Sequence, residues 1–107
     1  MYIYNVTINI DESAEAEFVL WMQQVHLPAM LQTRKFTEAK MTLVHVEQEN
    51  TGRNYSIQYS CNSKEDLESY YREFADKMRG EMDAKFAGRY VAFRTELETI
   101  LHYKVKS

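Results

Sequence analysis

The segment Trp21-Met-Gln-Gln-Val-His-Leu-Pro-Ala-Met-Leu-Gln-Thr-Arg-Lys-Phe36 holds the only tryptophan and the only proline of the chain, with His26 two residues before Pro28. Proline lacks a backbone N–H and disfavours helical dihedral angles in the residue before it. We therefore predict that one helix ends near His26. Because the missing N–H costs nothing at the first helical position, a short second helix is predicted from Pro28 to about Thr33.

On the N-terminal side, the pattern predicts a strand followed by the first helix. Residues 2–10 alternate between apolar and mostly polar side chains, which is typical of a strand with one buried face. Asp11 or Ser13 is expected to cap the free amides of the helix that follows. The expected buried stripe of that helix, at a spacing of about 3.6 residues, consists of Ala14, Phe18, Trp21 and Val25.

On the C-terminal side, the pattern first predicts a hairpin. Residues 36–47 are rich in strand-forming side chains, but their apolar positions change parity, so we expect a β-bulge in the middle. Glu49-Asn-Thr-Gly52 is a turn signal between strand patterns. The clear alternation of residues 53–61 predicts the second strand of this hairpin.

A long helix and a last strand are predicted to follow. Ser63 stands three residues before Asp66, the spacing of a capping box. The amphipathic helix after it is expected to end at Gly88 as a left-handed cap, with a local weakness at Gly80. The last strand is predicted from residue 89 to about residue 103.

The element order is therefore βαββαβ with a short extra helix after the first. This order predicts an α+β, ferredoxin-like fold, with helices covering one face of a four-stranded antiparallel sheet. The chain has 107 residues, 45% of them hydrophobic and 27% charged, which suits one domain over residues 1–107. Only 3 glycines and 1 proline are present, so long linkers are not expected.

The uncovered face of the sheet permits two interpretations. It is polar without being dominated by lysine and glutamate, so it is either a solvated face or the contact with a second chain. Two such sheets would close into a dimeric α+β barrel and hide their edges. The 8 tyrosines favour the homodimer, since tyrosine is enriched at interfaces. By parity, the residues assigned to this face are Asn5, Thr7, Ser56, Gln58, Arg94 and Glu96.

Composition argues against several classes of protein. A net charge of −3 disfavours nucleic acid, whose binding depends on lysine and arginine. Cys61 is the only cysteine, so neither an intrachain disulfide nor a zinc cluster is expected, and no cofactor motif is present. No apolar run approaches the roughly 20 residues of a membrane helix, and no secretory signal pattern opens the chain. We expect a cytoplasmic protein without metal, cofactor or membrane contact.

Five short motifs occur in an order that resembles a family of short bacterial proteins catalogued as a domain of unknown function. The motifs are Tyr4-Asn-Val-Thr7, Trp21 with His26-Leu-Pro28, Lys35-Phe36, Tyr55-Ser-Ile-Gln-Tyr59 and Phe86 to Glu98. The resemblance implies a fold similar to dimeric α+β barrel proteins, which include cofactor-free monooxygenases, decyclising and dehydrating enzymes and stress-response binding modules. It implies a homodimer and no particular activity. The resemblance implies a glycine at the position of Arg34, so the turn before Phe36 is expected to differ here.

His26 is the sharpest candidate for a functional residue. At a helix C-terminus the dipole would stabilise its imidazolium form, and it would serve as an acid/base or as a hydrogen-bonding partner of a small molecule. The alternative is that it only caps the last carbonyls of the helix. His45 and His102 have no partners at metal-binding spacing and are expected on the surface.

A pocket beneath the broken helix is the predicted setting for His26. Arg94 would hold an anionic group there, or would instead form an ion pair with Glu96. Trp21 has a second interpretation as an ordinary core residue. The predicted pocket residues are Trp21, His26, Leu27, Tyr4 and Tyr59.

Three functions compete on this evidence. The first is a homodimeric small-molecule-binding or regulatory module. The second is a cofactor-independent enzyme of the dimeric α+β barrel type that uses His26. The third is a structural dimer with no ligand.

Overall fold

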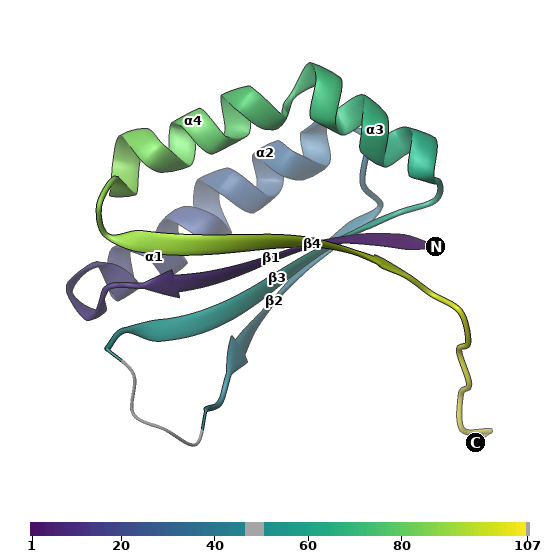
Figure 1. Ribbon diagram of the computed structural model, residues 1–107, viewed down its shortest axis with the longest axis horizontal. Coiled ribbons are helices and arrows are strands. Elements are labelled where there is room, and N and C mark those ends of the chain that lie inside the picture. Colours follow the sequence, from purple (N-terminus) through teal and green to yellow (C-terminus); the bar gives the residue numbers. More distant parts are fainter. Residues whose placement is uncertain (47–50, 107) are drawn as a thin grey trace.

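The computed structural model describes residues 1–46 and 51–106. Its helices lie on one face of a four-stranded antiparallel sheet with the strand order β2-β3-β1-β4 (Figure 1). This arrangement confirms the predicted α+β, ferredoxin-like fold. The strands are β1 (Tyr2–Ile10), β2 (Glu38–Val44), β3 (Arg53–Cys61) and β4 (Tyr90–Glu98).

The central strands β1 and β3 form as predicted, whereas β2 differs. The pairing of β2 with β3 runs without interruption from Glu38↔Ser60 to Val44↔Asn54, so the predicted bulge is wrong. The apolar pattern changes parity because Phe36, which is buried, lies in the turn before the strand and is not part of it. Of the predicted turn signal, Glu49 and Asn50 lie outside the described residues. Gly52 has a φ of 85°, which suits glycine.

The first helical segment is continuous, so the predicted break before Pro28 is wrong. Helix α1 (Glu15–Trp21), the π turn η2 (Met22–His26) and helix α2 (Leu27–Gln32) follow one another directly. Leu27 keeps helical angles (φ −62°, ψ −44°), and its N–H bonds to the carbonyl of Met22, five residues back. A proline ring clashes with the carbonyl four residues back in an α-helix. The wider π turn relieves this clash and lets the helix continue.

The π turn also changes which side chains face the core. One extra residue in the turn rotates the helix surface, so Val25 is 48% exposed and not buried as predicted. Met22, His26 and Met30 are buried in its place. At the start of the segment, neither Asp11 nor Ser13 caps through its side chain. The 3₁₀ turn η1 (Glu12–Ala14) leads into α1 instead.

The predicted long helix is two helices, α3 (Lys64–Glu73) and α4 (Ala75–Phe86). The interruption lies at Phe74, whose φ is −132°, and not at Gly80, where a weakness was predicted. Phe74 packs against the core, and both helices remain over the sheet (Figure 1). The predicted caps are confirmed. Ser63 Oγ accepts from the Asp66 N–H at 3.2 Å, and Gly88 has a φ of 76°.

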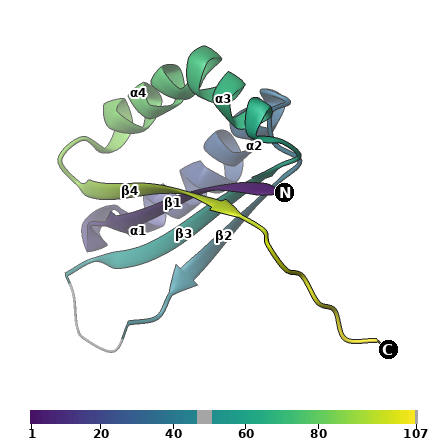
Figure 2. The ribbon, with the colours of Figure 1, turned by 45° about the vertical axis from the view of Figure 1, so that its right-hand side comes forward.

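Strand β4 is shorter than predicted, and its faces are reversed. Residues 99–106 have no regular structure, and they lead away from the sheet in both ribbon views (Figures 1 and 2). Pairing of Val6 with Arg94 and of Tyr4 with Glu96 places both charged residues on the helical side of the sheet. Their predicted place on the uncovered face is therefore wrong. The β4 residues on the uncovered face are Val91, Phe93, Thr95 and Leu97.

This reversal follows from the position of β4 at the edge of the sheet. Its helical side is only partly covered, so Arg94 and Glu96 there are both exposed. Polarity therefore does not distinguish the two faces of β4, although it does distinguish those of the central strands.

Candidate functional site

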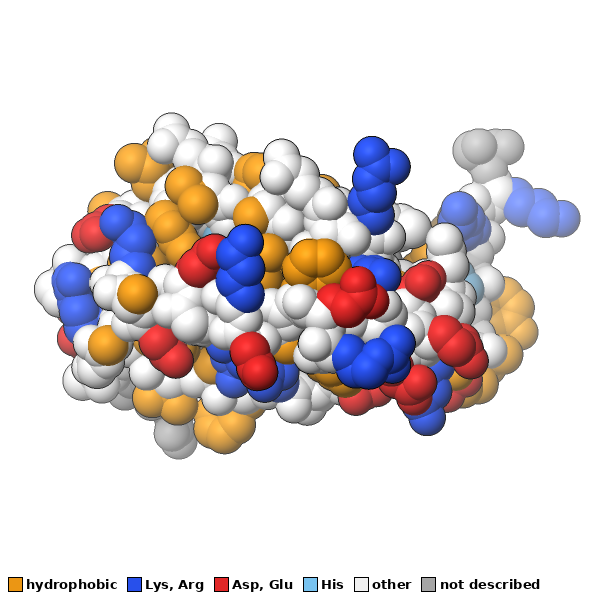
Figure 3. All heavy atoms as spheres, turned by 90° about the horizontal axis from the view of Figure 1, so that it is seen from above, with side chains coloured by type: hydrophobic (Ala, Val, Ile, Leu, Met, Phe, Trp, Pro, Cys, Tyr) orange, Lys and Arg blue, Asp and Glu red, His pale blue; other side chains and the backbone are white. Residues whose placement is uncertain are grey.

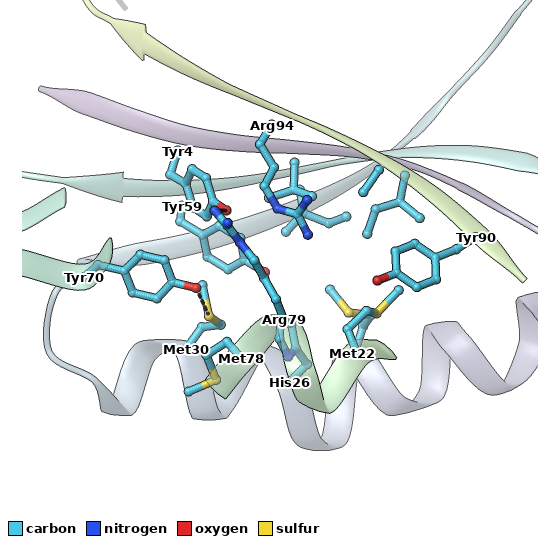
Figure 4. Close-up of a pocket in the computed structure, with 15 residues that line it drawn as sticks. Tyr4, Met22, His26, Met30, Tyr59, Tyr70, Met78, Arg79, Tyr90 and Arg94 are labelled. Carbon is cyan, nitrogen blue, oxygen red and sulfur yellow. Dashed lines mark hydrogen bonds between the residues drawn. The ribbon is translucent and has the colours of Figure 1, made fainter. Parts of the chain in front are cut away.

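A small cavity lies between η2, α2 and α4 on one side and the sheet on the other (Figure 4). Its volume is about 30 Å³, enough for one or two water molecules. Four tyrosines, four methionines, two arginines and one histidine line it together with aliphatic side chains from the sheet. Polar groups thus converge on a space whose walls are largely apolar, the usual composition of a small-molecule site.

The π turn places His26 at the floor of this cavity (Figure 4). The imidazole is 9% exposed and stacks on Trp21, with ring centroids 4.8 Å apart and planes inclined by 21°. Its Nδ1 is buried and has no hydrogen-bond partner among the described residues. The helix does not end here, so the predicted capping role and the predicted stabilisation of imidazolium are both wrong. Burial lowers the pKa of His26 to about 4, so the ring is neutral at pH 7.

A cluster of aromatic rings forms one wall. Tyr4 stacks on Tyr59 at 5.9 Å and on Phe36 at 6.2 Å between ring centroids. The Tyr70 hydroxyl donates to Met30 Sδ at 3.4 Å. Burial raises the pKa of Tyr59 and of Tyr70 far above the ordinary value, so both phenols keep their protons and act as neutral donors.

Two arginines approach the cavity from opposite sides (Figure 4). Arg79 reaches in from α4, and its Nη2 donates to the Tyr4 hydroxyl at 3.2 Å. The Arg79 Nε is buried without a hydrogen-bond partner in the part of the chain that the structure describes. Arg94 comes from β4 and is more exposed, so it stands at the mouth.

Sequence reasoning missed Arg79, although a signal for it exists. Ala75, Arg79, Met82 and Phe86 follow the helical spacing of i, i+4, i+7 and i+11. The other three are buried. A charged residue within such a stripe must be directed toward the core side of the helix, and this indicates either a buried pair or a ligand contact.

The structure brings four of the predicted site residues together around one cavity: Tyr4, Tyr59, His26 and Arg94. Trp21 lies behind His26 and does not line the space, and neither does Leu27. The predicted pair of Arg94 with Glu96 does not form. Glu96 instead accepts a hydrogen bond from the Tyr71 hydroxyl at 3.1 Å.

The surroundings of the site are mixed in charge. Acidic and basic side chains alternate over the face formed by the helices (Figure 3), which offers nucleic acid no continuous basic surface on that side. Within residues 1–46 and 51–106, no group of three or more His, Cys, Asp or Glu gathers to hold a metal ion. The helices among these residues are too short or too polar to cross a membrane.

The chain belongs to a family described as a domain of unknown function, DUF4286, which matches residues 1–100. This membership confirms the resemblance seen in the sequence motifs. No curated protein matches the chain.

Two of the solved structures that match this chain illustrate the shared fold. A dimeric ferredoxin-like protein from an uncultured marine organism is 8% identical, with a TM-score of 0.75 over 95% of this chain and 97% of its own. A protein of the ethyl tert-butyl ether D (EthD) family from Bacillus halodurans is 18% identical, with a TM-score of 0.65 over 94% of this chain and 100% of its own. At these identities the likeness shows the fold alone.

Proposed function

We propose that this DUF4286 family member is a homodimeric small-molecule-binding module of the cytoplasm, whose ligand occupies the cavity between η2, α4 and the sheet. The observation that carries the proposal is the convergence of His26, Tyr59 and Arg79 on one largely apolar space. Two of these residues present buried polar atoms without partners among the described residues. A bound molecule would satisfy those atoms, whereas a purely structural core would leave them unpaired at a cost.

The cavity must open to admit a ligand larger than water. Its side chains are suited to this, since methionine is unbranched and adapts its shape easily. Met22, Met30, Met78 and Met82 all line the space.

Catalysis by a cofactor-independent enzyme is the second candidate, because the unpaired His26 Nδ1 has the placement of a base. A general base works best when its pKa lies near the working pH. Burial lowers the pKa of His26 to about 4, which makes it a weak base at pH 7. Binding is therefore the better supported function. Loss of turnover in His26→Gln with unchanged ligand affinity would favour the enzyme instead.

The homodimer is proposed to form through the uncovered sheet face. Phe93 is 69% exposed there, Val91 57% and Leu97 40%. The polar residues beside them already satisfy one another. Ser56 Oγ donates to Asn5 Oδ1 at 2.7 Å, and Asn5 Nδ2 donates to Thr95 Oγ1 at 3.2 Å. Covering this face would thus bury apolar area without leaving these polar groups unpaired. The similar marine protein is described as dimeric.

Binding is tested with a panel of neutral, cationic and anionic small molecules. Trp21 is the only tryptophan and stacks on His26, so its fluorescence reports events in the cavity, and thermal unfolding gives a second signal. The matched control is Ala92→Leu, which fills the cavity from β4. We expect at least one class of compound to bind the wild type and to lose affinity in Ala92→Leu. The proposal fails if no compound in any class distinguishes the two proteins.

A further inference from the structure

We infer that the ligand of this cavity is a small monocarboxylate, held between Arg79 and Arg94, with its apolar body against the methionine side chains. This ligand class rests on the proposed binding function and gives it a chemical identity. Four features of the cavity support it: the direction of the arginines, their unpaired charge, the unsatisfied donor and the apolar walls.

The direction of the two guanidinium groups is the first feature. Arg79 extends from α4 and Arg94 from β4, and both reach the space between helix and sheet (Figure 4). The bond from Arg79 Nη2 to the Tyr4 hydroxyl fixes one edge of that guanidinium. The planar fork of N–H groups on arginine matches the two oxygens of a carboxylate.

The charge of these arginines is not neutralised by the protein. Three ion pairs occur among the described residues, and none of them includes Arg79 or Arg94. One acid on β4 and one on α4, the elements that carry these arginines, accept hydrogen bonds from tyrosines. Glu96 accepts from Tyr71, and Asp83 accepts from Tyr90. His26 is neutral at pH 7 and contributes no charge. The site is therefore positive and attracts an anion.

The buried Arg79 Nε is a donor that lacks an acceptor within the described part of the chain. A buried donor without an acceptor is costly, and more so when it is charged. Tyr59 adds a second donor, because burial raises the pKa of its phenol and keeps the proton in place. A carboxylate supplies only acceptors, so it complements this set of donors.

The walls distinguish a carboxylate from a phosphate. Met22, Met82 and Ile57 are apolar and buried, so the body of the ligand must be apolar too. A phosphate carries more charge and has no apolar part, so these walls would face its oxygens, and no glycine-rich loop lines the cavity among the described residues to supply backbone amides. The space of about 30 Å³ takes little more than a carboxylate head, so the methionines must shift around the body.

The test uses matched pairs that differ only in charge. Formate, acetate, hexanoate and benzoate are titrated by calorimetry beside formamide, acetamide, hexanamide and benzamide, together with inorganic phosphate. The variants are Arg79→Gln and Arg94→Gln, with Arg94→Lys to retain the charge. Arg72→Gln, at an exposed position on α3, is the matched control.

We expect at least one carboxylate to bind the wild type tenfold or more tightly than its amide. Each cavity variant should then weaken carboxylate binding tenfold or more and leave amide binding within twofold, since a hydrogen bond to a charged group is lost. Arg94→Lys should recover part of the affinity, and Arg72→Gln should change nothing. All proteins are first compared by circular dichroism.

Three outcomes overturn the ligand class. The first is that amides bind as tightly as carboxylates, the second that phosphate binds in preference to every carboxylate, and the third that Arg79→Gln and Arg94→Gln behave like Arg72→Gln. In the first case Ala92→Leu still abolishes binding, so the binding function stands without this ligand. If no compound distinguishes wild type from Ala92→Leu, the binding function itself fails.

Discussion

We expect His26 to lower the free energy of unfolding in acid, and we expect the substitution His26→Gln to remove this effect. The folded chain binds a proton on this ring only near pH 4, whereas an unfolded chain binds it near the ordinary value of 6.5. Because the folded-state pKa is lowered, the contribution of His26 is fully present above pH 6.5. It is lost as the pH falls from 6.5 to 4.

The magnitude follows from the distance between the two pKa values. A difference from 6.5 to about 4, at about 1.4 kcal/mol for each pH unit, gives about 3 kcal/mol at pH 4. No discount for solvent is needed, since the ring is only 9% exposed. Such a loss is a large part of the stability of a small domain.

The assay is urea unfolding followed by circular dichroism at pH 7.5, 6.5, 5.5, 4.5 and 4.0. Wild type is compared with His26→Gln, which keeps a polar side chain but does not titrate, and with His45→Gln at an exposed position. We expect the difference in unfolding free energy between His26→Gln and wild type to move by about 3 kcal/mol in favour of the variant between pH 7.5 and 4. Parallel curves for wild type and His26→Gln would refute the buried neutral histidine.

Four further results are expected. Arg34→Gly should raise the unfolding free energy by about 1 kcal/mol in urea, because Arg34 has a φ of 65° that glycine adopts freely; a loss of stability would contradict this. Ser63→Ala should lower it by about 1 kcal/mol through loss of the cap on α3, and no change in urea midpoint would argue against the cap. Phe93→Ser should convert the proposed dimer to monomers in light scattering at micromolar concentration. A wild-type protein that is already monomeric there would refute the proposed dimer through the sheet face. Deletion of residues 100–107 should shift the unfolding free energy by no more than about 0.5 kcal/mol, since Ile100, Leu101, Tyr103 and Val105 are 74% to 97% exposed.

The fold could be predicted from sequence because its central elements follow one period each. In β1 and β3 the alternation of buried and less buried residues holds from Tyr4 to Ile10 and from Tyr55 to Tyr59, since the helices cover one face of the sheet only. The edge strands β2 and β4 do not follow the pattern that their sequences indicated. Phe36 is buried before β2 begins, and Phe93 and Arg94 exchange the sides that their polarity indicated. Edge strands meet less of the helical layer, so the pattern constrains them less.

The site was harder to predict because it depends on a single inserted residue in a helix. Periodicity from Phe18 and Trp21 continues to Val25, which is exposed, and only the π turn moves His26 to the buried side. Pro28 signalled a disturbance, yet a proline is compatible with either a break or a wider turn. The same local geometry therefore explains three observations at once: the exposed Val25, the continuous helix and the buried His26. Arg79 then completes the site from α4, where helical spacing directs it toward the core but does not indicate which distant residues it meets.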